Sequence, residues 1–177
     1  MVKQWFEIIA PKHFKEKLLG ETAANEGGSL IGRVVDVSAP EVGADPSKYY
    51  MKLFFRIDTV NGSKALTKWV GHDCTRDFIS RIVAYRSVRI DTDDLIELKD
   101  CKVMVKSITV TFGRASGKTA KTIRRDVKSL IAESLKGMSS DEFVAALMDG
   151  KMQYEIKDKL HKIFPMRCFE FRKTQIL

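Results

Sequence analysis

The sequence predicts an α+β fold, in which an antiparallel, barrel-like β-sheet occupies the first two-thirds of the chain and helices pack against it mainly from the C-terminal third. Two observations lead to this prediction. Segments with the two-residue alternation of β-strands lie mostly before Phe112, whereas apolar residues at helical spacing recur mostly after it. In addition, the chain lacks the regular strand–helix alternation that a parallel nucleotide-binding sheet requires.

The length and composition indicate one globular domain. A chain of 177 residues is long enough for one domain with a hydrophobic core and short for two. We therefore predict a single domain over residues 1–177, with a barrel-like part at about 1–112 and a helical part with a final strand at about 113–177. Hydrophobic residues make up 44% of the chain and charged residues 31%, which is typical of a soluble protein. No apolar run suggests a signal peptide or membrane span, so the expected location is cytoplasmic.

The early strands are predicted from alternation and from turn residues. Strands are expected at Trp5–Ala10 and Leu30–Val37, with loops between them. The clearest prediction is a hairpin, because the strand patterns Tyr49–Asp58 and Ala65–Val70 flank Asn61-Gly62. This dipeptide is the preferred pair for a type I′ turn.

The middle of the chain returns to strand patterns after one helix, which is predicted to begin within Gly71–Ile79. Strands are expected at Val88–Leu98 and at Lys102–Phe112. Within the second of these, the apolar residues change from one face of the strand to the other. This change predicts a β-bulge or a barrel bend near Ser107.

Helices dominate the rest of the chain, and a strand-like segment follows Arg167. The sequence Ser139-Ser-Asp-Glu142 matches a capping box, so a short helix is expected from there to Gly150. A last helix is expected to end before Pro165. The longest predicted helix begins near Thr119 and has the apolar stripe Ile123, Val127, Leu130, Ile131 and Leu135.

The charge of the chain predicts a polyanionic partner. The formal net charge is +8 and the pI is about 9.4, which makes nucleic acid the first candidate and an anionic membrane surface the second. The excess of positive charge is unevenly distributed along the chain. Gly113–Gly137 contains seven basic and two acidic residues, and Lys151–Leu177 contains seven basic and three acidic residues. An anionic ligand is therefore expected at these two segments.

The long basic helix allows two interpretations. Its residues Lys121, Arg124, Arg125 and Lys128 fall on the side away from the apolar stripe. Most charge runs of this kind are simply solvated helix faces. These four cations, however, have no facing acids on the same helix, so a polyanion lying across them is an equally good interpretation. In either case all four are expected to project from an exposed surface, and their replacement by alanine is expected to leave the fold intact.

The loop before this helix suggests an alternative function, that of a P-loop-like nucleotide-binding enzyme. The segment Gly113-Arg-Ala-Ser-Gly117-Lys118-Thr119 resembles a Walker A loop. It has three residues between its glycines where a Walker A loop has four, which shortens the ring of amides around a phosphate. No apolar strand ending in Asp follows to hold magnesium. These departures favour RNA binding over the enzyme.

The cysteines predict reduced thiols. Cys74, Cys101 and Cys168 are odd in number and widely spaced, and they form no Cys-x-x-Cys pair, so neither a disulfide framework nor a zinc ribbon is indicated. His72 lies close to Cys74, but ordinary packing explains this pair better than a metal site does. No metal, cofactor or catalytic residue is predicted.

Several segments resemble the archaeal and eukaryotic small-ribosomal-subunit protein family called S-one-e or S-three-a-e. The most distinctive of them is Gly71-His-Asp-Cys-Thr-Arg-Asp77. The matching segments follow the family's order over essentially the whole chain, although Cys74 and Cys101 depart from the residues expected there. The other segments are Ile9–Lys12, Leu19–Thr22, Leu30–Arg33, Ile90-Asp91, Phe143-Val144, Gly150-Lys151, Ile163–Met166 and Arg172–Thr174.

This resemblance implies a structural constituent of the small ribosomal subunit. Family members are similar in having a β-barrel flanked by helices and in binding small-subunit ribosomal RNA on the platform, near the exit of the messenger RNA channel. The implied partners are this RNA, the neighbouring platform proteins and messenger RNA near the exit, and no catalytic activity is implied. Because the chain ends soon after the Arg172–Thr174 segment, it resembles the short archaeal form.

The predicted RNA contacts are cations that neutralise backbone phosphates and release counterions. They lie in the basic helix and its preceding loop, in the last strand and, as a weaker candidate surface, within Thr75–Arg89. Aromatic residues at Trp5, Trp69, Phe169 and Phe171 are expected to pack in the core, in preference to stacking on bases. The predicted RNA-binding residues are Arg114, Lys118, Lys121, Arg124, Arg125, Lys128, Arg167, Arg172, Lys173, Arg76, Arg81, Arg86 and Arg89.

Overall fold

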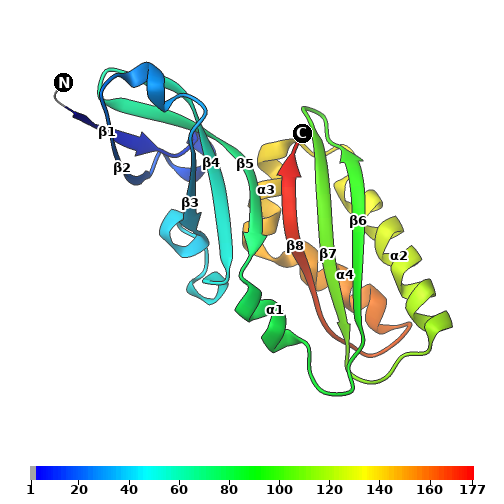
Figure 1. Ribbon diagram of the computed structural model, residues 1–177. Helices are drawn as coiled ribbons and strands as arrows, with labels where there is room; N and C mark the ends of the chain where they lie inside the picture. Colours follow the sequence, from blue (N-terminus) through cyan, green and yellow to red (C-terminus); the bar gives the residue numbers. More distant parts are fainter. Residues whose placement is uncertain (1–2) are drawn as a thin grey trace. The chain divides into compact units, whose positions relative to one another are not determined.

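The computed structural model describes residues 3–177 and shows mixed α and β structure, as predicted (Figure 1). The chain forms two compact units. The N-terminal unit extends to His72 and the C-terminal unit comprises Asp73–Leu177. In the part of the chain that the structure describes, no helix is both long and apolar enough to span a bilayer.

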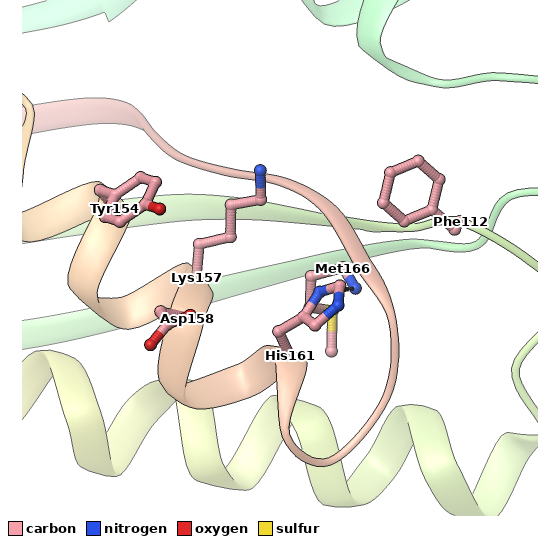
Figure 2. A pocket seen from close by; sticks show the side chains of 6 residues that line it. All are labelled: Phe112, Tyr154, Lys157, Asp158, His161 and Met166. Carbon is pink, nitrogen blue, oxygen red and sulfur yellow. Dashed lines mark hydrogen bonds between the residues drawn. The ribbon is translucent and has the colours of Figure 1, made fainter.

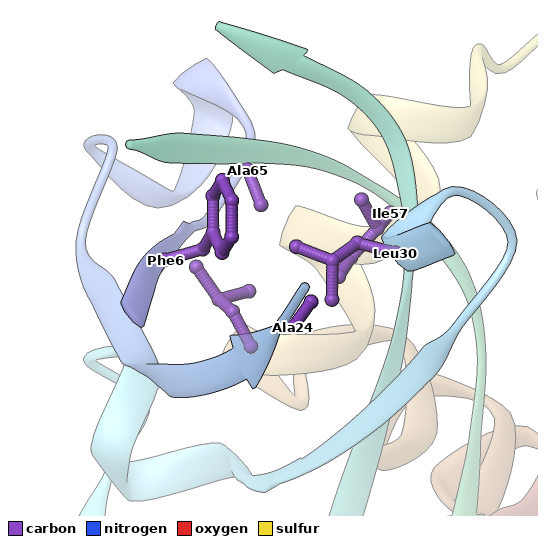
Figure 3. Packing of buried hydrophobic residues seen from close by; sticks show 6 residues of the cluster. Phe6, Ala24, Leu30, Ile57 and Ala65 are labelled. Carbon is purple, nitrogen blue, oxygen red and sulfur yellow. The ribbon is translucent and has the colours of Figure 1, made fainter. Parts of the chain in front are cut away.

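The N-terminal unit is built from five strands that pair in the order β2-β1-β5-β4-β3. The pairs β1–β2 and β3–β4 are antiparallel, whereas β1 and β5 run parallel. A cluster of buried apolar side chains fills the space beside this sheet (Figure 3): Phe6, Ile8, Ala24, Leu30, Ile57 and Ala65. The strands are β1 (Gln4–Ile9), β2 (Leu18–Ala24), β3 (Val34–Ser38), β4 (Met51–Asn61) and β5 (Lys64–Cys74).

The predicted hairpin is confirmed, since β4 and β5 pair around Asn61-Gly62. The turn itself differs from the expected type I′ turn: its two central residues are Gly62 and Ser63, and of these only Gly62 has a positive φ, +61°, which is the pattern of a type II′ turn. The strand β5 is longer than expected and continues to Cys74. The following helix, α1 (Arg76–Ile82), therefore begins only after Thr75.

In the N-terminal unit one predicted strand begins later than expected, and one strand was not predicted. The expected strand at Leu30–Val37 begins only at Val34, because residues Gly27–Leu30 form a 3-10 helix and Gly32 turns the chain with a φ of +89°. The strand β2 was not predicted at all. Its sequence contains glycine, alanine and glutamate, which have low β-propensity, so its pairing with β1 is what forms it.

The C-terminal unit contains a three-stranded antiparallel sheet in the order β6-β7-β8. Helices α2, α3 and α4 pack on it, and α2 and α4 also contact each other (Figure 1). The last strand of the chain pairs with β7 and so lies beside a strand more than fifty residues earlier. The elements are β6 (Arg89–Glu97), β7 (Lys102–Thr111), α2 (Gly117–Leu135), α3 (Ser140–Asp149), α4 (Lys151–His161) and β8 (Met166–Ile176).

The helices of this unit begin where the sequence predicts. Ser139 and Glu142 form both hydrogen bonds of the expected capping box at the start of α3. In α2 the stripe residues Ile123, Val127 and Ile131 are fully buried. Their side chains anchor the helix, so the opposite side of α2 carries its charges.

The aromatic residues divide between core and surface. Phe169, Phe171 and Trp69 are buried, as predicted. The same prediction is wrong for Trp5, which is mostly exposed. Trp5 directly precedes the buried Phe6 in β1, and strand alternation turns the Trp5 side chain to the opposite, exposed face, which it shares with Glu7.

A β-bulge interrupts the pairing of β7 with β8, at the position that the sequence predicts. Lys106 pairs with Lys173, but the next residue, Ser107, pairs with Phe171. Arg172 is therefore the extra residue of the bulge. The alternation of β8 shifts here, since Phe171 is buried and the next buried residue is Thr174.

The barrel-like form of the sheet is not confirmed. Within residues 3–177, the paths β2-β1-β5-β4-β3 and β6-β7-β8 are both open. The boundary between the two compact units follows His72. Strands β6 and β7 thus group with the helices that follow them.

That the chain unfolds as one domain remains a prediction, and the two units offer separate probes for it. Both tryptophans, Trp5 and Trp69, lie in the N-terminal unit, whereas the described α-helices all lie in the C-terminal unit. We expect urea unfolding followed by tryptophan fluorescence and by circular dichroism at the helix band to give coincident transitions. Separate midpoints for the two probes would show that the units unfold independently.

Candidate nucleic-acid interface

A cleft of about 450 Å³ in the C-terminal unit gathers four of the predicted RNA-binding cations. They come from three separate segments of the chain: Arg76 from α1, Arg89 from β6, and Arg172 with Lys173 from β8. We call this the basic cleft. Its other lining residues are Asp73, Cys74, Ile79 and Ser80.

The bulge explains how neighbouring residues of β8 both reach the basic cleft. In a regular strand, consecutive side chains such as those of Arg172 and Lys173 point to opposite faces of the sheet. Because Arg172 is the extra residue of the bulge, the alternation shifts and both side chains line the same cavity. Phe171, the residue before the bulge, is buried in the core. Its ring packs edge-on against that of Phe169, with 5.4 Å between the ring centroids.

The charges of the basic cleft are only partly compensated. The Lys173 ammonium lies 3.7 Å from the Asp73 carboxylate, and the Arg89 guanidinium pairs with Asp91 at 2.9 Å. The guanidinium groups of Arg76 and Arg172 have neither a hydrogen bond nor an ion pair with any residue in 3–177. The cleft therefore presents two arginines whose charges are available to an anion.

The thiol in the wall of the basic cleft is buried, which favours its neutral form. Burial raises the pKa of Cys74 far above its usual range, and the nearby carboxylates of Glu170 and Asp73 raise it further. The Cys74 Sγ donates a hydrogen bond to the Phe171 carbonyl at 3.3 Å. Burial likewise raises the pKa of Cys168 to about 11. Cys74 thus acts as a small buried side chain, in keeping with the aliphatic residue expected at its position.

The basic helix is partly neutralised by acids that the sequence did not place beside it. The Arg124 Nε donates a hydrogen bond to the Asp91 carbonyl at 3.3 Å, and the Lys128 Nζ donates to the Asp93 carbonyl at 3.0 Å. Lys128 also pairs with the Asp94 carboxylate at 2.7 Å. Strand β6 is the last strand of its sheet, so the backbone carbonyls on its outer edge have no neighbouring strand. The Arg124 and Lys128 side chains donate hydrogen bonds to two of these carbonyls.

This contact corrects two expectations for α2. Lys128 does have a facing acid, Asp94 of β6, and it is half-buried between the helix and β6, so the four cations do not all project from an exposed face. Replacing all four by alanine would therefore damage the fold as well as any RNA contact. Arg125 is well exposed and pairs only with the adjacent Asp126, at 3.2 Å.

The remaining predicted cations are spread over the surface. Arg114, Lys118, Lys121 and Arg167 are exposed, and none of their side chains has a hydrogen bond or ion pair within residues 3–177. The last two predicted cations, Arg81 and Arg86, make local contacts: the Arg81 Nε donates to the Asp77 carbonyl of its own helix at 3.4 Å, and the Arg86 guanidinium lies 5.3 Å from the centroid of the Tyr85 ring.

In the loop that resembles a Walker A motif, polar groups already form hydrogen bonds with neighbouring residues. The Ser116 side chain caps α2 by accepting from the Thr119 amide at 3.1 Å. The Thr111 hydroxyl donates to the Gly113 carbonyl at 2.7 Å. The strand before the loop belongs to an antiparallel sheet, unlike that of a P-loop protein. These contacts weigh against the nucleotide-binding alternative.

The sequence predicts Arg76 and Arg89 on one surface and Arg172 with Lys173 on another. The structure joins them, because β8 returns to pair with β7. The feature of the sequence that pointed to this joint surface was the predicted bulge near Ser107, since bulges often redirect side chains toward a functional site.

Comparison with known proteins places the chain in a family. The model of the ribosomal S3Ae family matches residues 1–177. The chain is 36% identical to small ribosomal subunit protein eS1 of Methanobrevibacter smithii, over 99% of this chain and 91% of that protein. It is 33% identical to the eS1 proteins of Desulfurococcus amylolyticus and Sulfurisphaera tokodaii, again over 99% of this chain and over 83% and 92% of theirs. The family that the sequence segments indicated is thereby confirmed, and this chain belongs to the ribosomal S3Ae family.

Proposed function

We propose that the protein is a structural constituent of the small ribosomal subunit and that it binds ribosomal RNA through the basic cleft. The observation that carries this proposal is the convergence of Arg76 and Arg172, both without an intramolecular partner in residues 3–177, with Arg89 and Lys173 in one cavity. The names of the archaeal relatives support the ribosomal role. We place the protein on the platform, beside other platform proteins and near the messenger RNA exit.

Phosphate is the chemical group that fits the basic cleft. A guanidinium group donates two parallel hydrogen bonds to phosphate oxygens, and two unpaired guanidiniums in one concavity can hold adjacent phosphates. Each contact releases condensed counterions, so affinity should fall steeply with salt. Such contacts fix the position of the protein on RNA more than they select a sequence, and paired RNA is recognised largely by its shape.

A second set of exposed cations would extend the RNA path. Arg114, Lys118 and Lys121 lie on the loop before α2 and on its first turns, where no acid in residues 3–177 pairs with them. Arg124 and Lys128, by contrast, are engaged by β6. The proposed RNA-facing part of α2 is therefore its N-terminal half.

The test removes the two unpaired arginines of the basic cleft. The variant Arg76→Gln/Arg172→Gln is expected to bind transcribed small-subunit ribosomal RNA of a relative such as Methanobrevibacter smithii about 10- to 100-fold more weakly, because two charge-assisted hydrogen bonds are lost. The slope of log affinity against log salt should fall by about two. Filter binding at several salt concentrations measures both quantities.

The matched control is Arg56→Gln/Lys64→Gln, which removes the same charge from exposed residues of the N-terminal unit. If this control loses as much affinity as the cleft variant, net charge alone drives binding and the cleft has no special role. If the folded cleft variant binds as tightly as the unchanged protein, the RNA contact lies elsewhere.

A further inference from the structure

A second, smaller cavity of the C-terminal unit lies between α4 and the residues that flank β8 and β7. It has a volume of about 220 Å³. Figure 2 shows Tyr154 and Phe112 on opposite sides of Lys157, with His161 and Met166 beside them. The last lining residue is Asp158. We call this the aromatic pocket.

The backbone fixes the aromatic pocket in place. The Phe112 amide donates a hydrogen bond to the Pro165 carbonyl at 3.0 Å, which ties the end of β7 to the turn before β8. The Met166 amide donates to the His161 Nδ1 at 3.1 Å. A neutral imidazole that accepts at Nδ1 carries its proton on Nε2, so His161 retains a hydrogen-bond donor.

Both aromatic side chains of the pocket are unusually open to solvent. Phe112 is 60% exposed and Tyr154 is 70% exposed. Isolated exposed apolar residues are common on protein surfaces. Here, however, two of them border one cavity that also contains a lysine and a histidine. Aromatic faces combined with cations are the pattern by which proteins hold single-stranded nucleic acid.

The charge around the aromatic pocket favours an anion as well. Lys157 lines it, and Asp158 is the one acid among its lining residues. Arg114 follows Phe112 by two residues, and Arg167 directly follows Met166. Both arginines are exposed and have no ion pair within the described chain.

We propose that the aromatic pocket binds one unpaired nucleobase of RNA, stacked on Phe112 or Tyr154, with its backbone phosphate at Lys157. This inference rests on the proposed RNA-binding function and adds a preference for single-stranded segments. The cavity is smaller than the roughly 300–1,000 Å³ of sites for drug-sized ligands, so a single planar base fits it better than a free nucleoside triphosphate. The His161 Nε2–H group would donate to the edge of the base.

The test compares two RNA probes, a 12-nucleotide single strand and a 12-base-pair duplex. We expect Phe112→Ala/Tyr154→Ala to weaken binding of the single strand by about 5- to 100-fold, the range that loss of aromatic stacking produces. Binding of the duplex should change by less than about twofold, because phosphate contacts remain. Fluorescence anisotropy measures both, and circular dichroism confirms the fold of each variant.

Two control variants separate stacking from other effects. The exchange Phe112→Tyr/Tyr154→Phe keeps both rings and should bind the single strand within about twofold of the unchanged protein. Leu95→Ala removes an exposed apolar side chain that lies outside the pocket and should have no effect. Equal loss of affinity for both probes in the double alanine variant would overturn the proposal.

The outcomes also distinguish this proposal from the broader one. If the unchanged protein binds both probes with strong salt dependence and the double alanine variant binds each probe with unchanged affinity, the aromatic pocket holds no base but the RNA-binding function stands. If the unchanged protein binds neither probe nor ribosomal RNA, the proposed function fails and the pocket proposal fails with it.

Discussion

Replacing Phe171 by alanine is expected to lower the free energy of unfolding by about 3–5 kcal/mol, the usual cost of deleting a buried aromatic ring. Phe171 is fully buried and packs edge-on against Phe169 and Phe143, at 5.4 and 6.1 Å between ring centroids. Since native domains are typically stable by only about 5–15 kcal/mol, this loss is a large fraction of the total. Chemical denaturation of the purified variant measures it.

The same substitution should also weaken RNA binding, because Phe171 supports the bulge that aims Arg172 and Lys173 into the basic cleft. For stability alone, Phe112→Ala provides the control: it deletes an equal ring from an exposed position and should change the free energy of unfolding by less than about 0.5 kcal/mol. A Phe171→Ala variant as stable as the Phe112→Ala variant would contradict the described packing of the sheet against its helices.

Lys128→Ala is expected to destabilise the protein by about 1–2 kcal/mol. The substitution removes charge-assisted hydrogen bonds to the Asp93 carbonyl and the Asp94 carboxylate. It also leaves the Asp94 side chain, only 18% exposed, without its cation, and its Oδ2 already has no hydrogen-bond partner in the described chain. An unpaired charge at a largely buried site costs more than the loss of a surface ion pair.

Lys121→Ala, on the same helix, is the matched comparison. Lys121 is exposed and has no ion pair in residues 3–177, so its loss should leave stability within about 0.5 kcal/mol while weakening RNA binding. A double-mutant cycle of Lys128→Ala with Asp94→Asn should give a coupling energy of about 0.5–3 kcal/mol. A coupling near zero would mean that the pair contributes nothing and that α2 is held by its apolar stripe alone.

These two substitutions separate two uses of positive charge on one helix. Arg124 and Lys128 bind the open edge of β6, whereas Lys118 and Lys121 remain exposed on the first turns. A high net charge therefore overstates the surface that an RNA can neutralise. The unpaired arginines of the basic cleft are a better guide to the interface than the length of the basic run.

Features set by neighbouring residues could be predicted well from the sequence. The capping box at Ser139 and Glu142, the β4–β5 hairpin that turns at Gly62 and the buried stripe of α2 each depend on residues a few positions apart. The bulge near Ser107 was predicted because a change of apolar face along one strand is also a local signal. Local patterns failed where pairing decided the structure, as in β2, which has weak strand propensity and forms against β1.

The sequence by itself determined the family, the α+β class and the abundance of cations beyond Phe112, because these depend on residue order and composition. Only the tertiary structure decided which cations are available. Asp91, Asp93 and Asp94 precede the residues that they engage on α2 by more than thirty positions, and Arg76 and Arg172 are almost a hundred apart. The electrostatic energy of two charges depends on their distance in space and not on their separation along the chain. The folded structure therefore decides which cations are paired with acids and which are available to a phosphate.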